Sequence, residues 1–411
     1  MMSSFVFTGG RFLDPRQDAL RDGVEVLVED GKIKEVADTA IRSQAATRIE
    51  LGGRTLMPGL IDAHIHLLLT EVNLQLLSDV PLTLLAAKGS VAMRAMLMRG
   101  FTTLRDTGGA DWGLKAAVEQ GLFEGPRLFI SGAPISQTGG HGDFRKRTQT
   151  RFACACCSGV SFVSRIADGV PEVIQAVRDE LRKGADQIKI MASGGVASQL
   201  DPLESLQFRT DEIEAAVDEA RRWGTYVCAH AYSPAAIERA VRAGVRTIEH
   251  GNLIDESTAQ LMAEREAFIV PTLVTYSSMR ERGVDYGMSQ YSLAKNEIVL
   301  EAGIRSLEIC RAAGVKIGFG TDLLGPLQND QSNEFLIRAR VLSPQEVIRS
   351  ATLVNAQILR QEGKLGELVA GAHADLLVVD GDPYNDLSVF LGEGTRIPAI
   401  MLGGRFVKNA L

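Results

Sequence analysis

Two histidines separated by one residue end an apolar segment of this 411-residue chain. They are His64 and His66, with Ile65 between them. Because successive side chains of a strand alternate between its faces, residues i and i+2 lie on the same face. The two imidazoles are therefore expected to be neighbours, as the ligands of one metal ion must be. A pair of this kind also arises by chance, so other ligands must accompany it.

Further groups suited to metal binding end other short apolar segments. His230 and His250 each end one, and Asp322 follows Gly320-Thr321 at the end of another. Imidazole nitrogen and carboxylate oxygen are ligands that Zn²⁺ and similar divalent ions accept. Four histidines and an aspartate at corresponding ends of several strands predict a metal centre.

A lysine stands inside one more of these segments, in Gln187-Ile188-Lys189-Ile190-Met191. A buried ammonium group is costly unless it is neutralised or paired. Burial favours the neutral amine, because desolvation penalises the charged form. Lys189 is therefore a candidate for a chemical role.

Eight short apolar segments alternate with helical ones in the middle of the chain. The expected strands are 56–67, 102–105, 127–131, 187–191, 226–229, 247–249, 268–273 and 316–320. Eight strand-then-helix units predict an α/β chain folded as a closed (β/α)₈ TIM barrel. Such barrels carry their chemistry at the carboxyl ends of the strands, where the metal candidates stand.

The expected helices have recognisable starts. Residues 171–183 carry apolar side chains at helical spacing. Ser233-Pro234 and Ser343-Pro344 each place proline directly after a capping serine, and Thr210 precedes two acidic residues as an expected N-cap.

Both ends of the chain are rich in short strands and turns. The apolar runs 24–28 and 374–379 are typical strands, and Asp30-Gly31 predicts a hairpin turn before residues 32–36. We therefore predict a small β-sandwich domain formed by residues 1–56 and 362–411, with the barrel domain spanning 57–361.

The composition argues against several classes of partner. Lys and Arg number 44 against 51 Asp and Glu, giving a net charge of −7 without a long basic run, so neither nucleic acid nor a membrane is expected as a partner. No export signal is evident, which predicts a cytoplasmic protein. The cysteines at 154, 156 and 157 fit either reduced thiols in a loop or a site for a soft metal.

Taken together, these motifs resemble the amidohydrolase superfamily of metal-dependent hydrolases. The resemblance includes Met57-Pro58-Gly59-Leu60-Ile61-Asp62-Ala63-His64-Ile65-His66, the lysine segment, both later histidines, Gly320-Thr321-Asp322 and Gly371-Ala372-His373-Ala374-Asp375-Leu376. By position it implies two divalent metal ions, expected to be Zn²⁺. One would be held by His64, His66 and Asp322, the other by His230 and His250, and Lys189 would bridge them as a CO₂-derived carbamate.

The resemblance also implies a mechanism. A hydroxide bridging the two metals would attack the substrate, and Asp322 would take its proton and pass it to the leaving amine. His141 and Tyr232 resemble positions that bind the carbonyl or carboxylate of the substrate, with a chance loop histidine as the alternative for His141. Arg145 is a further candidate for gripping a carboxylate, and a solvated surface charge is its alternative.

Lys189 favours the two-metal members over single-metal relatives such as imidazolonepropionases. The run Gly139-Gly140-His141-Gly142-Asp143 looks like the dipeptidase and carboxypeptidase branch. We therefore expect hydrolysis of a peptide or amide bond next to a free carboxylate, with an Xaa-Pro dipeptide (prolidase activity) or an N-acyl amino acid as substrate, in a homo-oligomer. The alternatives are a hydrolase of cyclic amides, lactones or phosphotriesters, and a non-catalytic metal-binding scaffold protein.

Overall fold

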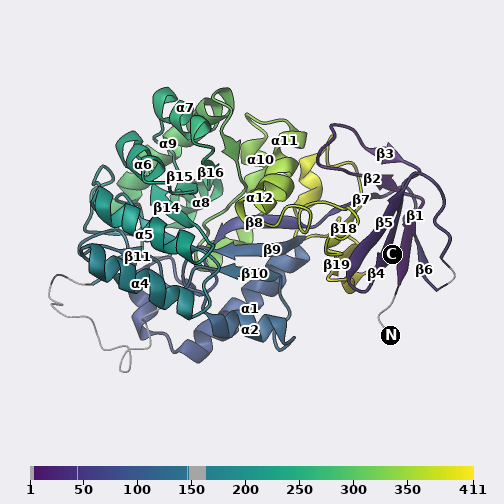
Figure 1. The fold of residues 1–411 in the computed structure, drawn as a ribbon, viewed down its shortest axis with the longest axis horizontal. Coiled ribbons are helices and arrows are strands. Elements are labelled where there is room, and N and C mark those ends of the chain that lie inside the picture. Colours follow the sequence, from purple (N-terminus) through teal and green to yellow (C-terminus); the bar gives the residue numbers. More distant parts are fainter. Residues whose placement is uncertain (1–3, 44, 146, 148–162) are drawn as a thin grey trace.

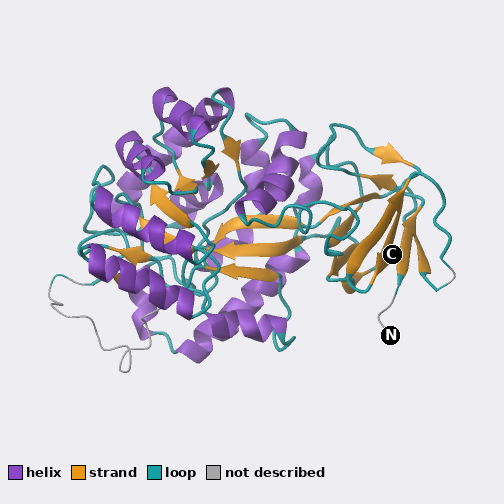
Figure 2. Ribbon diagram, in the orientation of Figure 1, coloured by secondary structure: helices purple, strands orange, loops and turns teal. Residues whose placement is uncertain are grey.

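The computed structural model describes residues 4–43, 45–145, 147 and 163–411. A larger body rich in helices stands beside a smaller β-rich body, and both ends of the chain lie in the smaller one (Figure 1). Helices cover the strands of the larger body, whereas the smaller body consists mainly of strands and loops (Figure 2). Cys154, Cys156 and Cys157 lie outside the described residues.

Parallel strands form the centre of the larger body. The first sheet has the order β10-β9-β8, and the second has the order β12-β11-β13-β14-β15-β16-β17, with every pair parallel. The chain is therefore of the α/β class. The strands are β8 (Leu60–Ile65), β9 (Phe101–Asp106), β10 (Arg127–Ile130), β11 (Ile135–Ser136), β12 (Arg165–Ile166), β13 (Ile188–Met191), β14 (Val227–Ala231), β15 (Thr247–His250), β16 (Phe268–Val270) and β17 (Lys316–Ile317).

Backbone hydrogen bonds also connect the two parallel sheets. The amide of Ala63 in β8 donates to Phe319 O at 2.9 Å, just beyond β17. At the other side, the amide of Asp186 donates to Ile130 O at the end of β10, over 2.7 Å. The carboxyl ends of the first and last of the expected barrel strands therefore lie next to each other.

The helices bury one apolar face against these sheets. In α4, for example, Val173, Ala176, Val177 and Leu181 are buried. The α-helices are α1 (Leu82–Met98), α2 (Trp112–Glu119), α4 (Val170–Arg182), α5 (Thr210–Arg222), α6 (Pro234–Arg242), α7 (Glu256–Glu264), α8 (Leu273–Arg282), α9 (Gln290–Ala312), α10 (Asn333–Arg338), α11 (Pro344–Arg349) and α12 (Asn355–Ile358). Among the helices of the described ranges, none has both the length and the apolar character needed to cross a membrane.

Two predicted helix starts are confirmed and one is wrong by a residue. The hydroxyls of Ser233 and Ser343 cap α6 and α11 by accepting hydrogen bonds from backbone amides. Thr210, however, is the first residue of α5 rather than its cap. Arg209 is the N-cap, because the Glu212 carboxylate accepts the Arg209 amide at 2.6 Å.

The predicted strands all differ somewhat from the structure in their bounds, and three of them differ most. The segment 56–67 divides into β7 (Thr55–Pro58) and β8, with Gly59 between them. Gly59 is required there, because a Cβ would lie 2.0 Å from Thr102 Oγ1. The strand expected at 268–273 ends at Val270, since α8 begins at Leu273, and only residues 316–317 of 316–320 are paired as a strand.

The smaller body combines strands from both ends of the chain. One sheet has the order β5-β4-β1-β6 and the other the order β20-β19-β18-β7-β2-β3. The hairpin predicted at Asp30-Gly31 is confirmed, and both residues have positive φ angles, of 50° and 77°. The strands are β1 (Phe5–Thr8), β2 (Arg11–Phe12), β3 (Arg21–Asp22), β4 (Glu25–Glu29), β5 (Lys32–Ala37), β6 (Thr47–Glu50), β7, β18 (Leu376–Val379), β19 (Ala399–Leu402) and β20 (Arg405–Asn409).

Candidate metal centre

The side chains predicted to bind metal meet at one cavity. It is lined by His64, His66, Lys189, His230, His250 and Asp322, together with His141 and Tyr232. The six predicted ligands come from β8, β13, β14, β15 or the turns that follow a parallel strand. Because parallel strands of such a sheet end at the same edge, residues up to 258 positions apart in the chain become neighbours there.

Asp322 contacts three of the histidines. Its Oδ1 lies 3.1 Å from His66 Nε2 and 3.4 Å from His64 Nε2, and its Oδ2 lies 3.9 Å from His250 Nδ1. Burial raises the pKa of Asp322, but the neighbouring histidines outweigh burial and hold that pKa well below its usual range. Asp322 is therefore a carboxylate, the form that binds a cation or accepts a proton.

Each of the four histidines has one ring nitrogen paired with the surrounding protein. The other nitrogen is left as the candidate metal ligand, because a protein partner on one nitrogen sets the tautomer and the ring orientation. The pairs are His64 Nδ1 with Glu249 Oε2 (2.7 Å), His66 Nδ1 with Gly108 O (2.7 Å), His230 Nε2 with Gly194 O (3.0 Å) and His250 Nδ1 with Thr272 Oγ1 (2.8 Å).

The donor set fits a metal ion. Ligand atoms of His64, His250 and Asp322 all lie within 4.8 Å of one another. His64 Nε2 is buried and completes no hydrogen bond within the described part of the chain. Burial lowers the pKa of His230 and of His250 well below the usual value, so both rings are neutral at pH 7, as metal binding requires.

Lys189 reaches the same cavity from the middle of β13. It is 2% exposed, and its side chain lines the cavity beside the predicted histidine ligands. Burial lowers the pKa of its amine, although Glu249, Cys228 and Asp322 act in the opposite direction. Burial thus acts toward the neutral amine that the sequence predicts.

A buried ion pair behind His64 was missed by sequence reasoning. Arg105 donates to both carboxylate oxygens of Glu249, at 2.8 and 2.9 Å, and both side chains are fully buried. Burial raises the pKa of Glu249, but Arg105 and His64 outweigh it and lower the pKa to about 2. The charged carboxylate can thus accept Nδ1–H of His64. A charged residue inside an apolar strand was the available signal, as it was for Lys189.

His141 and Tyr232 lie in the wall of the cavity beside His230. The His141 ring stacks on that of His230 with centroids 4.3 Å apart, and the Tyr232 ring lies 4.8 Å from it. The Tyr232 hydroxyl is 3.0 Å from that of Tyr276, a cavity residue that the sequence did not single out. Burial lowers the pKa of His141 to about 3, so its ring is neutral.

The structure does not bring Arg145 to this cavity. Its Nε and a terminal nitrogen donate to Asp143 at 2.7 and 2.6 Å. Arg145 instead lines a small neighbouring hollow, which shares Leu74, Phe144 and Ala197 with the wall of the cavity. Asp143 thus binds the guanidinium group of Arg145 in the bidentate manner that was expected of a substrate carboxylate.

Away from the ligands, the cavity wall is apolar. It is formed by Leu69, Leu74, Pro134, Phe144, Val163, Met191, Val196, Ala197, Met279 and Leu324. An apolar wall lowers the local dielectric constant and so strengthens the interactions of charged groups within it.

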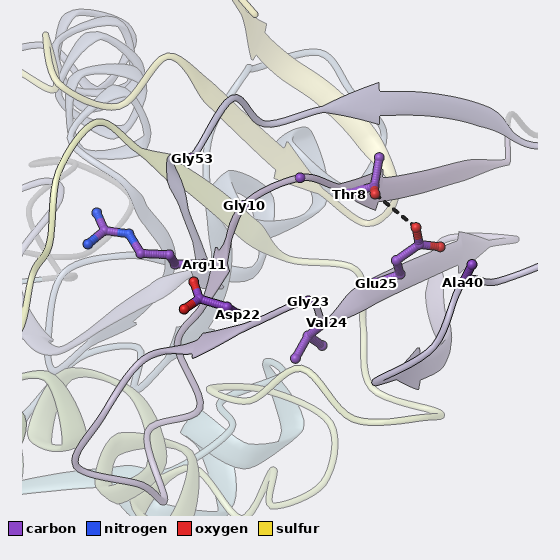
Figure 3. Close-up of a pocket in the computed structure, with 10 residues that line it drawn as sticks. Thr8, Gly10, Arg11, Asp22, Gly23, Val24, Glu25, Ala40 and Gly53 are labelled. Carbon is purple, nitrogen blue, oxygen red and sulfur yellow. Dashed lines mark hydrogen bonds between the residues drawn. The ribbon is translucent and has the colours of Figure 1, made fainter.

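A second hollow lies in the smaller body, between Thr8, Arg11, Asp22 and Glu25 (Figure 3). Two of its charged groups already have partners: Glu25 accepts a hydrogen bond from Thr8 Oγ1 at 2.8 Å, and Arg11 donates to Gly381 O at 2.9 Å. It contains no histidine, and its lining offers no set of convergent ligands. The candidate site is therefore the cavity at the strand ends.

Comparison with known protein families matches residues 55–407 to the amidohydrolase family. The chain belongs to the amidohydrolase family. It is accordingly a hydrolase that acts on C–N bonds. The match includes every predicted metal ligand, and the α/β fold is that of the solved amidohydrolases below.

Three relatives illustrate the similarity of this amidohydrolase to proteins already described. Ochratoxinase of Aspergillus niger is 31% identical over 374 residues, which cover 86% of this chain and 76% of that protein. The crystal structure of an amidohydrolase is 54% identical with a TM-score of 0.97, covering 99% of both chains. The crystal structure of a prolidase complexed with N-methylphosphonate-L-proline is 49% identical with a TM-score of 0.96, covering 99% of this chain and 100% of that chain.

Proposed function

We propose that this amidohydrolase cleaves a peptide or amide bond next to a free carboxylate. Xaa-Pro dipeptides are the first expected substrates, and N-acyl amino acids are the second. The observation that carries the proposal is the set of six candidate ligands around one cavity, with His141 and Tyr232 in its wall. The prolidase relative supports the carboxylate-bearing class, because its bound ligand is a derivative of proline.

The proposed metal ligands divide into two groups. His64, His66 and Asp322 would hold one ion and His230 and His250 the other, with Lys189, as a carbamate, between them. Zn²⁺ is the expected metal, since neutral imidazole and carboxylate suit it. When bound, the two ions would polarise the scissile carbonyl and lower the pKa of a water molecule.

The chain's own groups would move protons and orient the substrate. Asp322, ionised in the folded protein, would take a proton from the attacking water at a carboxylate oxygen and deliver it to the leaving amine. Tyr232 keeps its proton, because burial raises the pKa of its hydroxyl, and it can donate a hydrogen bond to a substrate oxygen. His141 is the second proposed substrate contact, and Arg145, bound to Asp143, is left out.

We further propose that the parallel strands close into a (β/α)₈ barrel. The hydrogen bonds that connect β8 with residue 319 and β10 with residue 186 support closure. The proposed domains are 57–361 for the barrel and 1–56 with 362–411 for a β-sandwich, and β7 runs across the first of these boundaries. Homo-oligomerisation and a cytoplasmic location stay predictions.

A substrate panel tests the function. We expect metal-loaded protein to hydrolyse Xaa-Pro dipeptides or N-acyl amino acids, and to lose most of its kcat/KM when the substrate carboxylate is blocked as an amide. Absence of turnover for every carboxylate-bearing amide overturns the proposal. Turnover of lactones, cyclic amides or paraoxon instead identifies another hydrolase on this scaffold. Fewer than about one metal ion per chain, with no activity after Zn²⁺ is added, identifies a non-catalytic protein.

A further inference from the structure

A buried lysine outside the predicted ligand set lies on α9. Lys295 is 4% exposed, and its Nζ donates to the carbonyl oxygens of Gly195, Ser198 (2.6 Å) and Asp201 (3.2 Å). An ammonium group has three hydrogens, so the three acceptors use all of them. All three carbonyls belong to the segment 194–201, between β13 and α5, which we call the 194–201 loop.

The same loop contacts two rings of the candidate site. Gly194 O accepts the hydrogen bond of His230 Nε2 at 3.0 Å. Ser198 Oγ lies 2.7 Å from His141 Nδ1, and its own hydroxyl donates to Gly195 O at 3.2 Å. The loop thus pairs with one ring nitrogen of a predicted metal ligand and with one ring nitrogen of a predicted substrate contact.

The absence of a side chain at Gly195 lets the His141 ring lie close to the backbone of the 194–201 loop. A Cβ at that position would lie 2.1 Å from His141 Cε1, so the ring packs directly against the loop backbone. A shift of the loop would therefore move His141, whose stacking partner is His230.

A second set of hydrogen bonds holds the loop in one conformation. Asp201 Oδ2 accepts from the Gly195 amide and from Gln207 Nε2, both at 3.1 Å. Gln207 Oε1 in turn accepts the backbone amide of His141 at 2.8 Å. The loop and His141 thus form one connected network, and Lys295 attaches that network to α9.

The surroundings of Lys295 explain why an ammonium group suits this position. Three carbonyl oxygens converge on one buried point, and an apolar side chain there would leave them without hydrogen-bond donors. Lys295 also lies 4.7 Å from the centroid of the Tyr291 ring, an additional favourable contact for a cation. The residue joins segments about 100 positions apart, and no sequence motif marks it.

From these contacts we infer that Lys295 is a positioning residue for the reaction, acting through the 194–201 loop on His230 and His141. The inference rests on the proposed function, because it assigns His230 to a metal ion and His141 to the substrate. Lys295 itself does not line the cavity.

Two variants and a control test this role. Lys295→Met keeps a side chain of similar length and removes the donors, Lys295→Arg restores donors, and Lys34→Met changes an exposed lysine on β5. Three quantities are measured: hydrogen–deuterium exchange of peptides covering 193–207, affinity for Zn²⁺ by titration, and kcat and KM.

For Lys295→Met we expect faster exchange confined to the loop region. Zn²⁺ affinity of the weaker site and kcat/KM should each fall by about 10- to 100-fold, as for other residues that orient a metal ligand. Lys295→Arg should recover part of both losses, and Lys34→Met should match the wild type. Wild-type exchange in the loop together with wild-type Zn²⁺ affinity in Lys295→Met would overturn the inference.

Ser198→Ala covers the case in which Lys295→Met fails to fold. It removes the contact to His141 and keeps the three carbonyls, so KM should rise while Zn²⁺ affinity stays unchanged. Unchanged KM and kcat in Ser198→Ala would refute the link between the loop and His141. If the wild type hydrolyses none of the carboxylate-bearing amides, the proposed function fails, whereas exchange and Zn²⁺ affinity still decide the role of Lys295.

Discussion

Glu249 Oε2 lies 2.7 Å from Nδ1 of His64, and both side chains are fully buried. The contact holds the proton of His64 on Nδ1, which leaves Nε2 for a cation. Arg105 keeps the carboxylate ionised, so two residues, from β9 and β15, determine which ring nitrogen of His64 on β8 carries the proton.

Replacing Glu249 with glutamine should weaken both metal binding and the fold. The amide can still accept from His64, but it leaves the buried charge of Arg105 uncompensated. We expect a loss of about 3–5 kcal/mol in unfolding free energy and about 10- to 100-fold in Zn²⁺ affinity. Urea unfolding and Zn²⁺ titration measure the two effects, and Glu264→Gln, at an exposed site on α7, is the control. An unchanged Zn²⁺ affinity would show that Glu249 does not orient His64.

Asp322→Asn should keep the fold and lose turnover. The amide cannot accept the proton that the proposed mechanism gives to Asp322, so kcat should fall by about 10²- to 10⁴-fold. Thermal unfolding and bound Zn²⁺ are measured in parallel, because Asp322 is also a proposed ligand. Near-wild-type kcat would refute the proton-transfer role.

Lys189→Ala should lose bound metal together with activity. The variant removes the only proposed group that reaches both ions. A short carboxylic acid such as propionate, added at high concentration, should restore part of each by supplying two oxygens in the place of the carbamate. The wild type with propionate is the control, and metal analysis is the measurement. Unchanged metal content in Lys189→Ala would exclude the bridge.

The metal-free protein should lose stability on acidification. His141 has a pKa of about 3 when folded because burial disfavours its charged form, whereas an unfolded histidine titrates near 6.5. As the pH falls, the histidine is protonated first in the unfolded chain. The contribution of His141 to the unfolding free energy is therefore fully present above about pH 6.5 and decreases as the pH falls toward 3. Between pH 7 and 5 this one histidine should contribute a loss of about 2 kcal/mol.

Urea unfolding of EDTA-treated protein at pH 7 and pH 5 measures that loss. His230 and His250 act in the same direction, because their pKa values are also lowered by burial. His66 opposes them, since Asp322 outweighs burial and raises its pKa. The variant His141→Gln isolates the contribution of this histidine. Between pH 7 and pH 5 the variant should lose less unfolding free energy than the wild type. An equal loss would contradict the buried neutral state of His141.

Much of this protein was readable from its sequence. The period of a strand placed His64 and His66 on one face, and the ends of parallel strands placed His230, His250 and Asp322 at one edge. Both rules depend only on backbone geometry, so residue types and spacing are enough to apply them. The same holds for Ser233-Pro234 at the start of α6 and for the turn at Asp30-Gly31.

Tertiary structure decided what surrounds those ligands. Which nitrogen of each histidine is free depends on partners such as Glu249 and Gly194, which approach from other elements. The position of the Arg145 side chain depends on its hydrogen bonds to Asp143. Lys295 reaches the 194–201 loop only because α9 packs beside that loop. Contacts of this kind follow from packing between distant segments, and no local pattern of residues encodes them.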